Sequence, residues 1–290
     1  MDLLGPNNYL EAKGFGLMIG SDSESPNRLD NSGVRLDYNS AVERVMSLAN
    51  FERSNDSYRH SEFHLERISR LLDCLGNPHL RVPTVHVAGS KGKGSTSAMV
   101  ASILGVSGYK VGMYTSPHLH SVVERIRVGG KPIERGEFAS LVELILSSEE
   151  LSIDEVSGSG LTFFEAATVL GLYAFEREGV EVAVVEVGLG GRLDATNVIR
   201  PEISAITNVA LDHSDYLGDS LIGIAREKLG IVKPGIPLVT TESDKGLLEI
   251  FREVTRDVGS PCLKATEPVP DRIGVSPDRT RFTLETNAWG

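Results

Sequence analysis

Residues 85–96, VHVAGSKGKGST, combine glycine, lysine and hydroxyl side chains at spacings that suit phosphate binding. Glycines let backbone N–H groups converge on phosphate oxygens, and the N-terminus of a following helix adds a partial positive charge. Lys93 is placed to reach the terminal phosphates of a nucleotide, and the Ser95 hydroxyl to ligate Mg²⁺. The spacing departs from the consensus G-x-x-x-x-G-K-[ST], since residue 87 is Val and Gly94 separates Lys93 from Ser95. The alternative interpretation is a lysine-rich turn that binds no nucleotide.

Two further polar residues, Glu186 and His213, follow apolar runs of the chain. Glu186 lies near the end of the run 182–187, and ligands of open α/β sheets bind at the carboxyl edge of the strands. A strand-end carboxylate that caps the next turn is the alternative for this residue. His213 follows the run 203–207 on a polar loop, where an isolated histidine is otherwise a surface or packed residue.

The elements that must position these residues alternate between short apolar runs and helix-like stretches. Strands are expected at 84–88, 110–114, 182–187, 203–207 and 236–240. Helices are expected at 95–104, 137–147, 163–178 and 221–229. This alternation predicts a doubly wound α/β domain with a mostly parallel sheet.

The two ends of the chain differ from this repeating region. Residues 1–36 show little periodicity and are expected to form a loosely ordered extension. Residues 38–75 are expected to be helical, and residues 37–265 to form the ATP-binding domain. Residues 266–290 contain one strand-like run at 281–285, which we interpret as the start of a truncated C-terminal domain.

Composition narrows the classes of partner. The chain has 290 residues, a net charge of −11 and 40% hydrophobic residues, which is ordinary for a globular protein. It offers no global basic field for nucleic acid, and no apolar run is long enough to span a bilayer. Two cysteines far apart in sequence predict neither a disulfide framework nor a metal cluster, so a cytoplasmic location is expected.

Five ordered blocks between residues 60 and 240 resemble the folylpolyglutamate synthases, within the wider Mur-ligase-like family. Residues 89–95, GSKGKGS, resemble the phosphate loop G-T-N-G-K-G-S, with Ser90 in place of Thr and Lys91 in place of Asn. Residues 186–197 match the block EVGLGGRLDATN residue for residue. The other blocks are 115–119 with 124–126 (TSPHL and ERI), 162–165 (TFFE), and 211–213 with 227–233 (LDH and EKLGIVK).

The resemblance implies roles for individual residues. The ATP-binding residues would be Gly89, Ser90, Lys91, Gly92, Lys93, Gly94 and Ser95. Mg²⁺ would be held by Ser95, Ser116, Glu186 and His213, and Lys228 would be carried as a carbamate. A carbamate is an anion, so it helps to hold a metal that an ammonium would repel. The pterin substrate would meet Thr162, Leu193, Asp194 and Ala195.

The resemblance also implies the reaction, which is ATP-dependent ligation of L-glutamate to a carboxylate of dihydropteroate or a reduced folate through an acyl phosphate. A monomer is expected. Because the motif blocks cease after Lys233, we expect this chain to be the ATP-binding portion, with weak nucleotide binding and little ligase activity alone. Two alternatives stay open: another Mur-type amino-acid ligase, acting for example on peptidoglycan precursors, and a non-catalytic nucleotide-binding fragment.

Overall fold

The computed structural model describes residues 36–49, 65–146, 161–211, 220–265, 271–276 and 279–283. Contacts divide the chain into two units, one of which is Arg35–Ala265. In the other unit the described residues are two antiparallel strands, β9 (Asp271–Ser276) and β10 (Arg279–Thr283). The expectation of one strand in this region is therefore wrong, because β10 has a hydrogen-bonded partner in β9. Apart from Leu36, the predicted extension at 1–36 lies outside the described residues.

One sheet forms the centre of the larger unit. Its strands are β1 (Thr84–Ala88), β2 (Val111–Tyr114), β3 (Ile126–Val128), β4 (Lys131–Pro132), β5 (Val182–Glu186), β6 (Ile203–Ile206), β7 (Leu238–Thr240) and β8 (Cys262–Lys264). The order is β4-β3-β2-β5-β1-β6-β7-β8, in which the pairs β2–β3 and β3–β4 are antiparallel and all other neighbouring pairs are parallel. The predicted α/β class with a mostly parallel sheet is confirmed.

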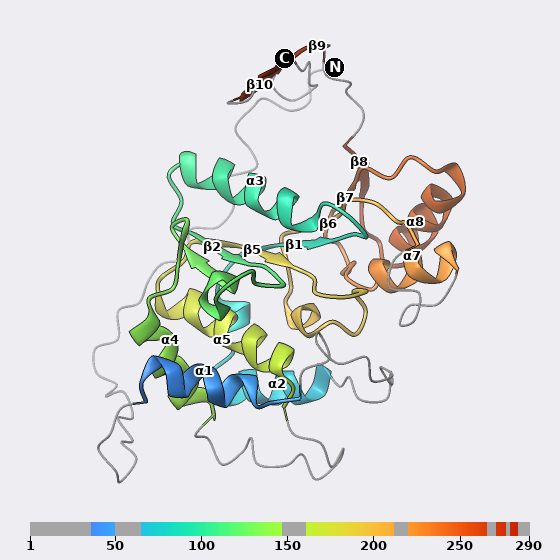
Figure 1. Ribbon diagram of the computed structural model, residues 1–290. Helices are drawn as coiled ribbons and strands as arrows, with labels where there is room; N and C mark the ends of the chain where they lie inside the picture. Colours follow the sequence, from blue (N-terminus) through green and yellow to red (C-terminus); the bar gives the residue numbers. More distant parts are fainter. Residues whose placement is uncertain are drawn as a thin grey trace, which may run out of the picture. The chain divides into compact units, whose positions relative to one another are not determined.

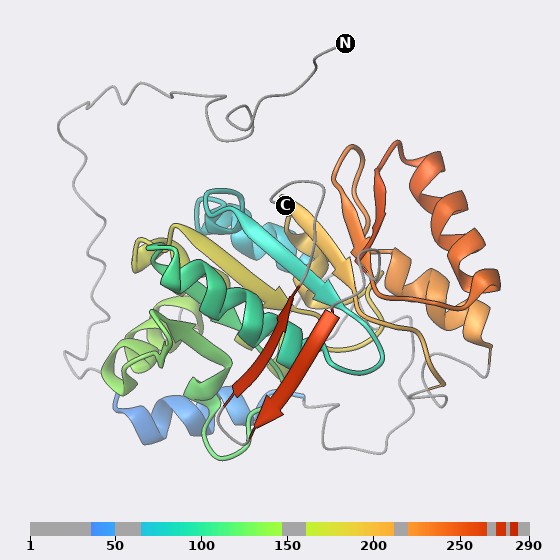
Figure 2. The same cartoon turned by 90° about the horizontal axis from the view of Figure 1, so that it is seen from above.

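Helices cover both faces of this sheet. They are α1 (Tyr38–Met46), α2 (Leu65–Cys74), α3 (Lys93–Val106), α4 (Arg135–Leu146), α5 (Phe163–Arg177), α7 (Leu221–Leu229) and α8 (Lys245–Asp257), with short 3₁₀ helices η2 (Pro78–Leu80), η3 (Val122–Arg125) and η5 (Ala195–Val198). Figure 1 shows α3 on one face and α1, α2, α4 and α5 on the other. Figure 2, from above, shows α3 over the strands that it contacts, β1, β2 and β5. Across these described segments, no helix is long and apolar enough to cross a membrane.

Two local sequence patterns explain how these elements form. In α2, the apolar residues Ile68, Leu71 and Leu72 recur at helical spacing and form a buried face, each at most 5% exposed. The helix then ends where Gly76 and Asn77 adopt positive φ angles of 80° and 59°, a conformation that glycine and asparagine tolerate best. Four of the five residues of β5 are buried, as expected for a parallel strand covered on both faces.

The direction in which the chain adds strands to the sheet changes at β1. From β1 the chain passes through α3 to β2, whereas from β5 it passes to β6 on the other side of β1. Ligands of open α/β sheets bind outside the carboxyl ends of the strands at such a change of direction. The loops that follow β1, β5 and β6 therefore share the expected ligand-binding edge.

Candidate functional site

The phosphate loop connects β1 directly to α3, and its backbone depends on two glycines. Gly89 has φ 149°, and a Cβ atom built on it would lie 1.8 Å from Thr207 Oγ1, so no side chain fits there. Gly92 has φ 79° and is the N-cap residue of α3. The first N–H groups of a helix have no intrahelical acceptor, so the first turn of α3 presents donors and a positive dipole end to an anion.

Three further predicted ATP-binding residues, Ser90, Lys91 and Lys93, make hydrogen bonds within the protein. Lys93, the first residue of α3, donates from Nζ to the Gly89 carbonyl oxygen at 3.0 Å. The backbone N–H of Ser90 donates to the Asn208 carbonyl oxygen at 2.9 Å. The Lys91 N–H donates to Asn208 Oδ1, also at 2.9 Å. Direct contacts of these residues with ATP stay predictions.

Glu186 lies beside the first turn of α3. A Cβ atom built on Gly94 would be 3.5 Å from both carboxylate oxygens of Glu186. The Ser116 N–H donates to Glu186 Oε2 at 3.1 Å, and the residue is only 4% exposed. Burial raises the pKa of the Glu186 carboxyl, opposed by the Ser116 N–H and by the positive charge of Lys93. Its predicted alternative, a cap on its own following turn, is wrong, because its hydrogen-bond donor comes from the loop after β2.

The structure brings two of the four predicted metal ligands, Ser116 and Glu186, into contact, and it places Ser95 in the turn of α3 that lies beside Glu186. Ser95 follows Gly94 in α3, and Ser116 contacts Glu186 through its backbone. His213 lies outside the described residues. Within the described segments there is no group of three or more His, Cys, Asp or Glu side chains that could hold a metal. The proposed set therefore depends on serine hydroxyls in addition to one carboxylate.

Lys228 lies at the end of α7 and is only 3% exposed. Lys228 therefore does not face solvent, whereas its carbamylation, and the alternative of a salt bridge with the neighbours of Glu227, stay predictions. The end of α7 packs against the loop after β5. The Arg192 N–H donates to the Glu227 carbonyl oxygen at 2.8 Å, and a Cβ atom on Gly191 would lie 2.8 Å from that oxygen.

The four predicted pterin residues lie at the starts of two helices. Thr162 is the N-cap of α5, and its hydroxyl accepts a hydrogen bond from the Glu165 N–H at 3.2 Å. Asp194 is the N-cap of η5, which begins at Ala195, and Leu193 is half-buried. Burial raises the pKa of the Asp194 carboxyl. The side chains of Thr162 and Asp194 are thus already used in capping, and their contacts with a pterin stay predictions.

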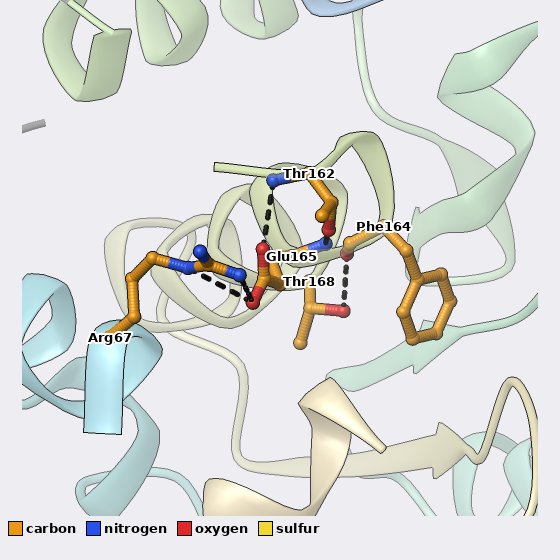
Figure 3. Close-up of polar contacts among 5 residues, drawn as sticks. All are labelled: Arg67, Thr162, Phe164, Glu165 and Thr168. Carbon is orange, nitrogen blue, oxygen red and sulfur yellow. Dashed lines mark hydrogen bonds and ion pairs between the residues drawn. The ribbon is translucent and has the colours of Figure 1, made fainter. Parts of the chain in front are cut away.

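A buried ion pair fixes the start of α5 and was not predicted (Figure 3). Arg67 of α2 donates to Glu165 Oε1 from Nη2 at 2.6 Å and from Nε at 3.2 Å. The other carboxylate oxygen of Glu165 accepts the Thr162 N–H at 2.8 Å. Phe164, the residue before Glu165, covers the loop after β5, since a Cβ atom on Gly188 would lie 2.4 Å from its ring. The pair spans 98 positions in sequence, so no local pattern could have revealed it.

A buried series of hydrogen bonds links β1 to η5. His86 Nε2 lies 2.9 Å from Thr196 Oγ1, and that hydroxyl donates to Asp194 Oδ1. Because the Thr196 hydroxyl donates its proton to Asp194, it can only accept from His86. The proton of the neutral ring therefore lies on Nε2, which donates to Thr196 Oγ1. The other ring nitrogen, Nδ1, has no hydrogen-bond partner within the described part of the chain. Burial lowers the pKa of His86 to about 3, so the ring is neutral at physiological pH.

Stability should therefore fall in acid because of His86. Below its unfolded pKa of about 6.5, the unfolded chain binds a proton that the folded chain refuses until about pH 3. The loss should approach about 1.4 kcal/mol per pH unit below pH 6. Urea unfolding of the parent and of His86→Gln between pH 7.5 and 5.0 measures it. Glutamine keeps an N–H donor for Thr196, and an equal acid dependence in both proteins would contradict the assignment. Glu186 and Asp194, with raised folded pKa values, act in the opposite direction in both proteins.

Known proteins are similar to the part of the chain that contains the phosphate loop and Glu186. The Mur ligase middle domain matches residues 87–253. A probable bifunctional folylpolyglutamate synthase/dihydropteroate synthase from Haloferax volcanii is 42% identical over 224 residues, which are 77% of this chain and 25% of that protein. The apo form of folylpolyglutamate synthase (FPGS) from L. casei is similar with a TM-score of 0.78 and 33% identity, over 87% of this chain and 60% of that chain.

An FPGS–AMPPCP–folate complex is similar to the same extent, with a TM-score of 0.78 and 33% identity over 87% of this chain and 60% of the other. The chain thus spans less than two thirds of the length of each of these relatives.

Proposed function

Because this chain belongs to the Mur ligase family through its middle domain, we propose that residues 37–265 bind ATP in a ligase that joins L-glutamate to a folate or dihydropteroate carboxylate. The proposal depends chiefly on the phosphate loop and on the buried Glu186 beside it, whose carboxylate oxygens lie 3.5 Å from a Cβ atom built on Gly94. The relatives support the substrate class, since one is described as a folylpolyglutamate synthase and another as an FPGS–AMPPCP–folate complex.

The proposed reaction activates a carboxylate. The γ-phosphate of ATP passes to the substrate carboxylate and gives an acyl phosphate and ADP. The amino group of L-glutamate then attacks the acyl carbon, so an amide forms and phosphate leaves. Transfer of this kind needs positioning and charge neutralisation rather than a protein nucleophile. The Lys93 ammonium and the amides of the first turn of α3 would supply both.

The residues beside the phosphate loop fit Mg²⁺. Mg²⁺ prefers oxygen ligands and keeps several waters, and Glu186 offers a carboxylate between two serine-bearing segments. Burial raises the pKa of that carboxyl by disfavouring its ionised form. A cation beside it would act against this shift, because an opposite charge favours the ionised form. Ser95, Ser116 and Glu186 would hold the ion, with His213 as a further ligand. When bound, Mg²⁺ would neutralise charge on the transferred phosphoryl group.

The remaining assignments are also part of this proposal. Thr162, Leu193, Asp194 and Ala195 would border the pterin, and Lys228 would be carbamylated, for which its burial at 3% exposure is a precondition. We further propose a monomer in the cytoplasm. The chain has two cysteines, Cys74 and Cys262, far apart in sequence, which supports a reducing location.

Ligand-induced stabilisation tests the proposal. Because a ligand that binds only the folded state raises its stability, we expect Mg-ATP to raise the melting temperature of the 290-residue chain. Dihydropteroate or tetrahydrofolate should raise it further, and a peptidoglycan precursor should not. Incubation with Mg-ATP, L-glutamate and each pterin, followed by mass spectrometry, then measures amide formation.

The outcomes separate the alternatives. Stabilisation by a peptidoglycan precursor but by neither pterin would favour another Mur-type ligase. Stabilisation by Mg-ATP alone would favour a nucleotide-binding module, and a lack of any response to Mg-ATP would refute the nucleotide site itself.

A further inference from the structure

The segment that leaves β6, residues 207–210, holds the phosphate loop through both backbone and side chains. The Thr207 N–H donates to the Ala88 carbonyl oxygen at 3.0 Å, and the Ser90 N–H donates to the Asn208 carbonyl oxygen at 2.9 Å. The parallel ladder between β1 and β6 thus continues beyond both strands. Thr207 Oγ1 then donates to the Lys91 carbonyl oxygen at 2.6 Å.

Asn208 extends this ladder by one more residue. After its backbone carbonyl has accepted the Ser90 N–H, its side-chain Oδ1 accepts the next amide, that of Lys91, at 2.9 Å. Asn208 therefore accepts hydrogen bonds from two successive N–H groups of the phosphate loop. The peptide plane before Lys91 is held immediately ahead of the turn at Gly92, where φ is 79°.

The segment 207–210 is itself held at its far side. The Ser90 hydroxyl donates to the Ala210 carbonyl oxygen at 3.0 Å and accepts the Ala210 N–H at 2.9 Å. Val209 donates its N–H to Glu242 Oε2 at 2.9 Å, and Glu242 is only 6% exposed. Since β7 ends just before Glu242, the loops after three neighbouring strands form one connected hydrogen-bonded rim.

From these contacts we propose that Asn208 is a positioning residue for nucleotide binding. It fixes the first half of the phosphate loop, so that the amides of Ser90 and Lys91 stay with the protein and those of residues 92–95 receive the phosphates. The proposal rests on the nucleotide site proposed above and adds which amides serve it. A loop ordered before binding loses less entropy when the ligand arrives, which strengthens binding.

Asn208→Ala tests this with a single lost contact, because the backbone carbonyl that accepts from Ser90 remains. Hydrogen exchange, read by NMR on the ligand-free chain, should show faster exchange of the Lys91 amide and an unchanged Ser90 amide. Titration with a non-hydrolysable ATP analogue and Mg²⁺ should give about tenfold weaker binding than the parent, since the loss of one hydrogen bond costs about 1 kcal/mol. Thr241→Val is the matched control, since its hydroxyl donates to the Thr207 carbonyl oxygen in the same rim without touching the phosphate loop.

We expect the control to bind the analogue as the parent does. Equal affinity of Asn208→Ala and the parent would overturn the proposal, as would an equal loss in Thr241→Val. Unchanged exchange at the Lys91 amide would also overturn it. If the parent itself did not bind the analogue, the nucleotide site would be refuted, and the exchange result would still decide whether Asn208 orders the loop.

Discussion

Replacing Lys93 by alanine should remove most of the stabilisation that Mg-ATP gives this chain. The Lys93 ammonium donates to the Gly89 carbonyl oxygen at 3.0 Å, so it lies over the loop at the start of α3. When phosphate binds, this ammonium would exchange a neutral acceptor for an anionic one and gain the attraction between opposite charges. The variant loses that gain together with the positive charge.

The size of the effect follows from mass action. A ligand at about 100 times its Kd stabilises the folded state by about 2.7 kcal/mol. If the substitution raises Kd about 100-fold, the same ligand concentration stabilises by only about 0.4 kcal/mol. Thermal unfolding with and without Mg-ATP at one fixed concentration measures this difference.

Lys131→Ala is the control, because it removes the same charge from an exposed position on β4. It should respond to Mg-ATP as the parent does. A Lys93→Ala variant stabilised as strongly as the parent would show that this lysine does not contact the nucleotide.

The fold was predictable where strands are buried on both faces. β1 and β5, which are mostly buried, lie within a residue of the predicted runs, because a covered parallel strand is almost entirely apolar. β4 is the opposite case, with two exposed residues, Lys131 and Pro132, at the edge of the sheet. Its place depends on pairing with β3 rather than on any pattern of its own. β9 was missed for a related reason, since DRIGVS mixes charged and small residues with only two apolar ones.

The candidate site was predictable only in its local part. The glycines around Lys93 indicated the phosphate loop, and the end of an apolar strand indicated Glu186. Asn208 and Glu242 gave no such signal, because their partners in the rim lie in loops that follow other strands of the sheet. Hydrogen bonds between loops follow from strand order, and a single sequence shows the strands without their order.

A buried ion pair gives the second large effect, on folding stability. The Arg67 and Glu165 side chains are 8% and 3% exposed, and the two residues join α2 to the start of α5 (Figure 3). Arg67→Met should destabilise the chain by about 3–5 kcal/mol, since removing one partner leaves an uncompensated buried charge. Urea unfolding at pH 7.5 measures the loss. The exposed pair Arg226–Glu253, with both side chains more than half exposed, gives the control: Arg226→Met should cost at most about 1 kcal/mol.

The double variant Arg67→Met/Glu165→Gln separates charge from packing. The glutamine carbonyl oxygen can still accept the Thr162 N–H that Glu165 Oε2 accepts at 2.8 Å, so the cap of α5 is kept while the buried charge is removed. Replacing a buried pair by neutral groups is often nearly neutral for stability. The double variant should therefore be more stable than Arg67→Met alone, although it carries one more substitution. If instead the two substitutions were additive, the cost of Arg67→Met would come from lost packing between α2 and α5, and the ion pair would not be what fixes the start of α5.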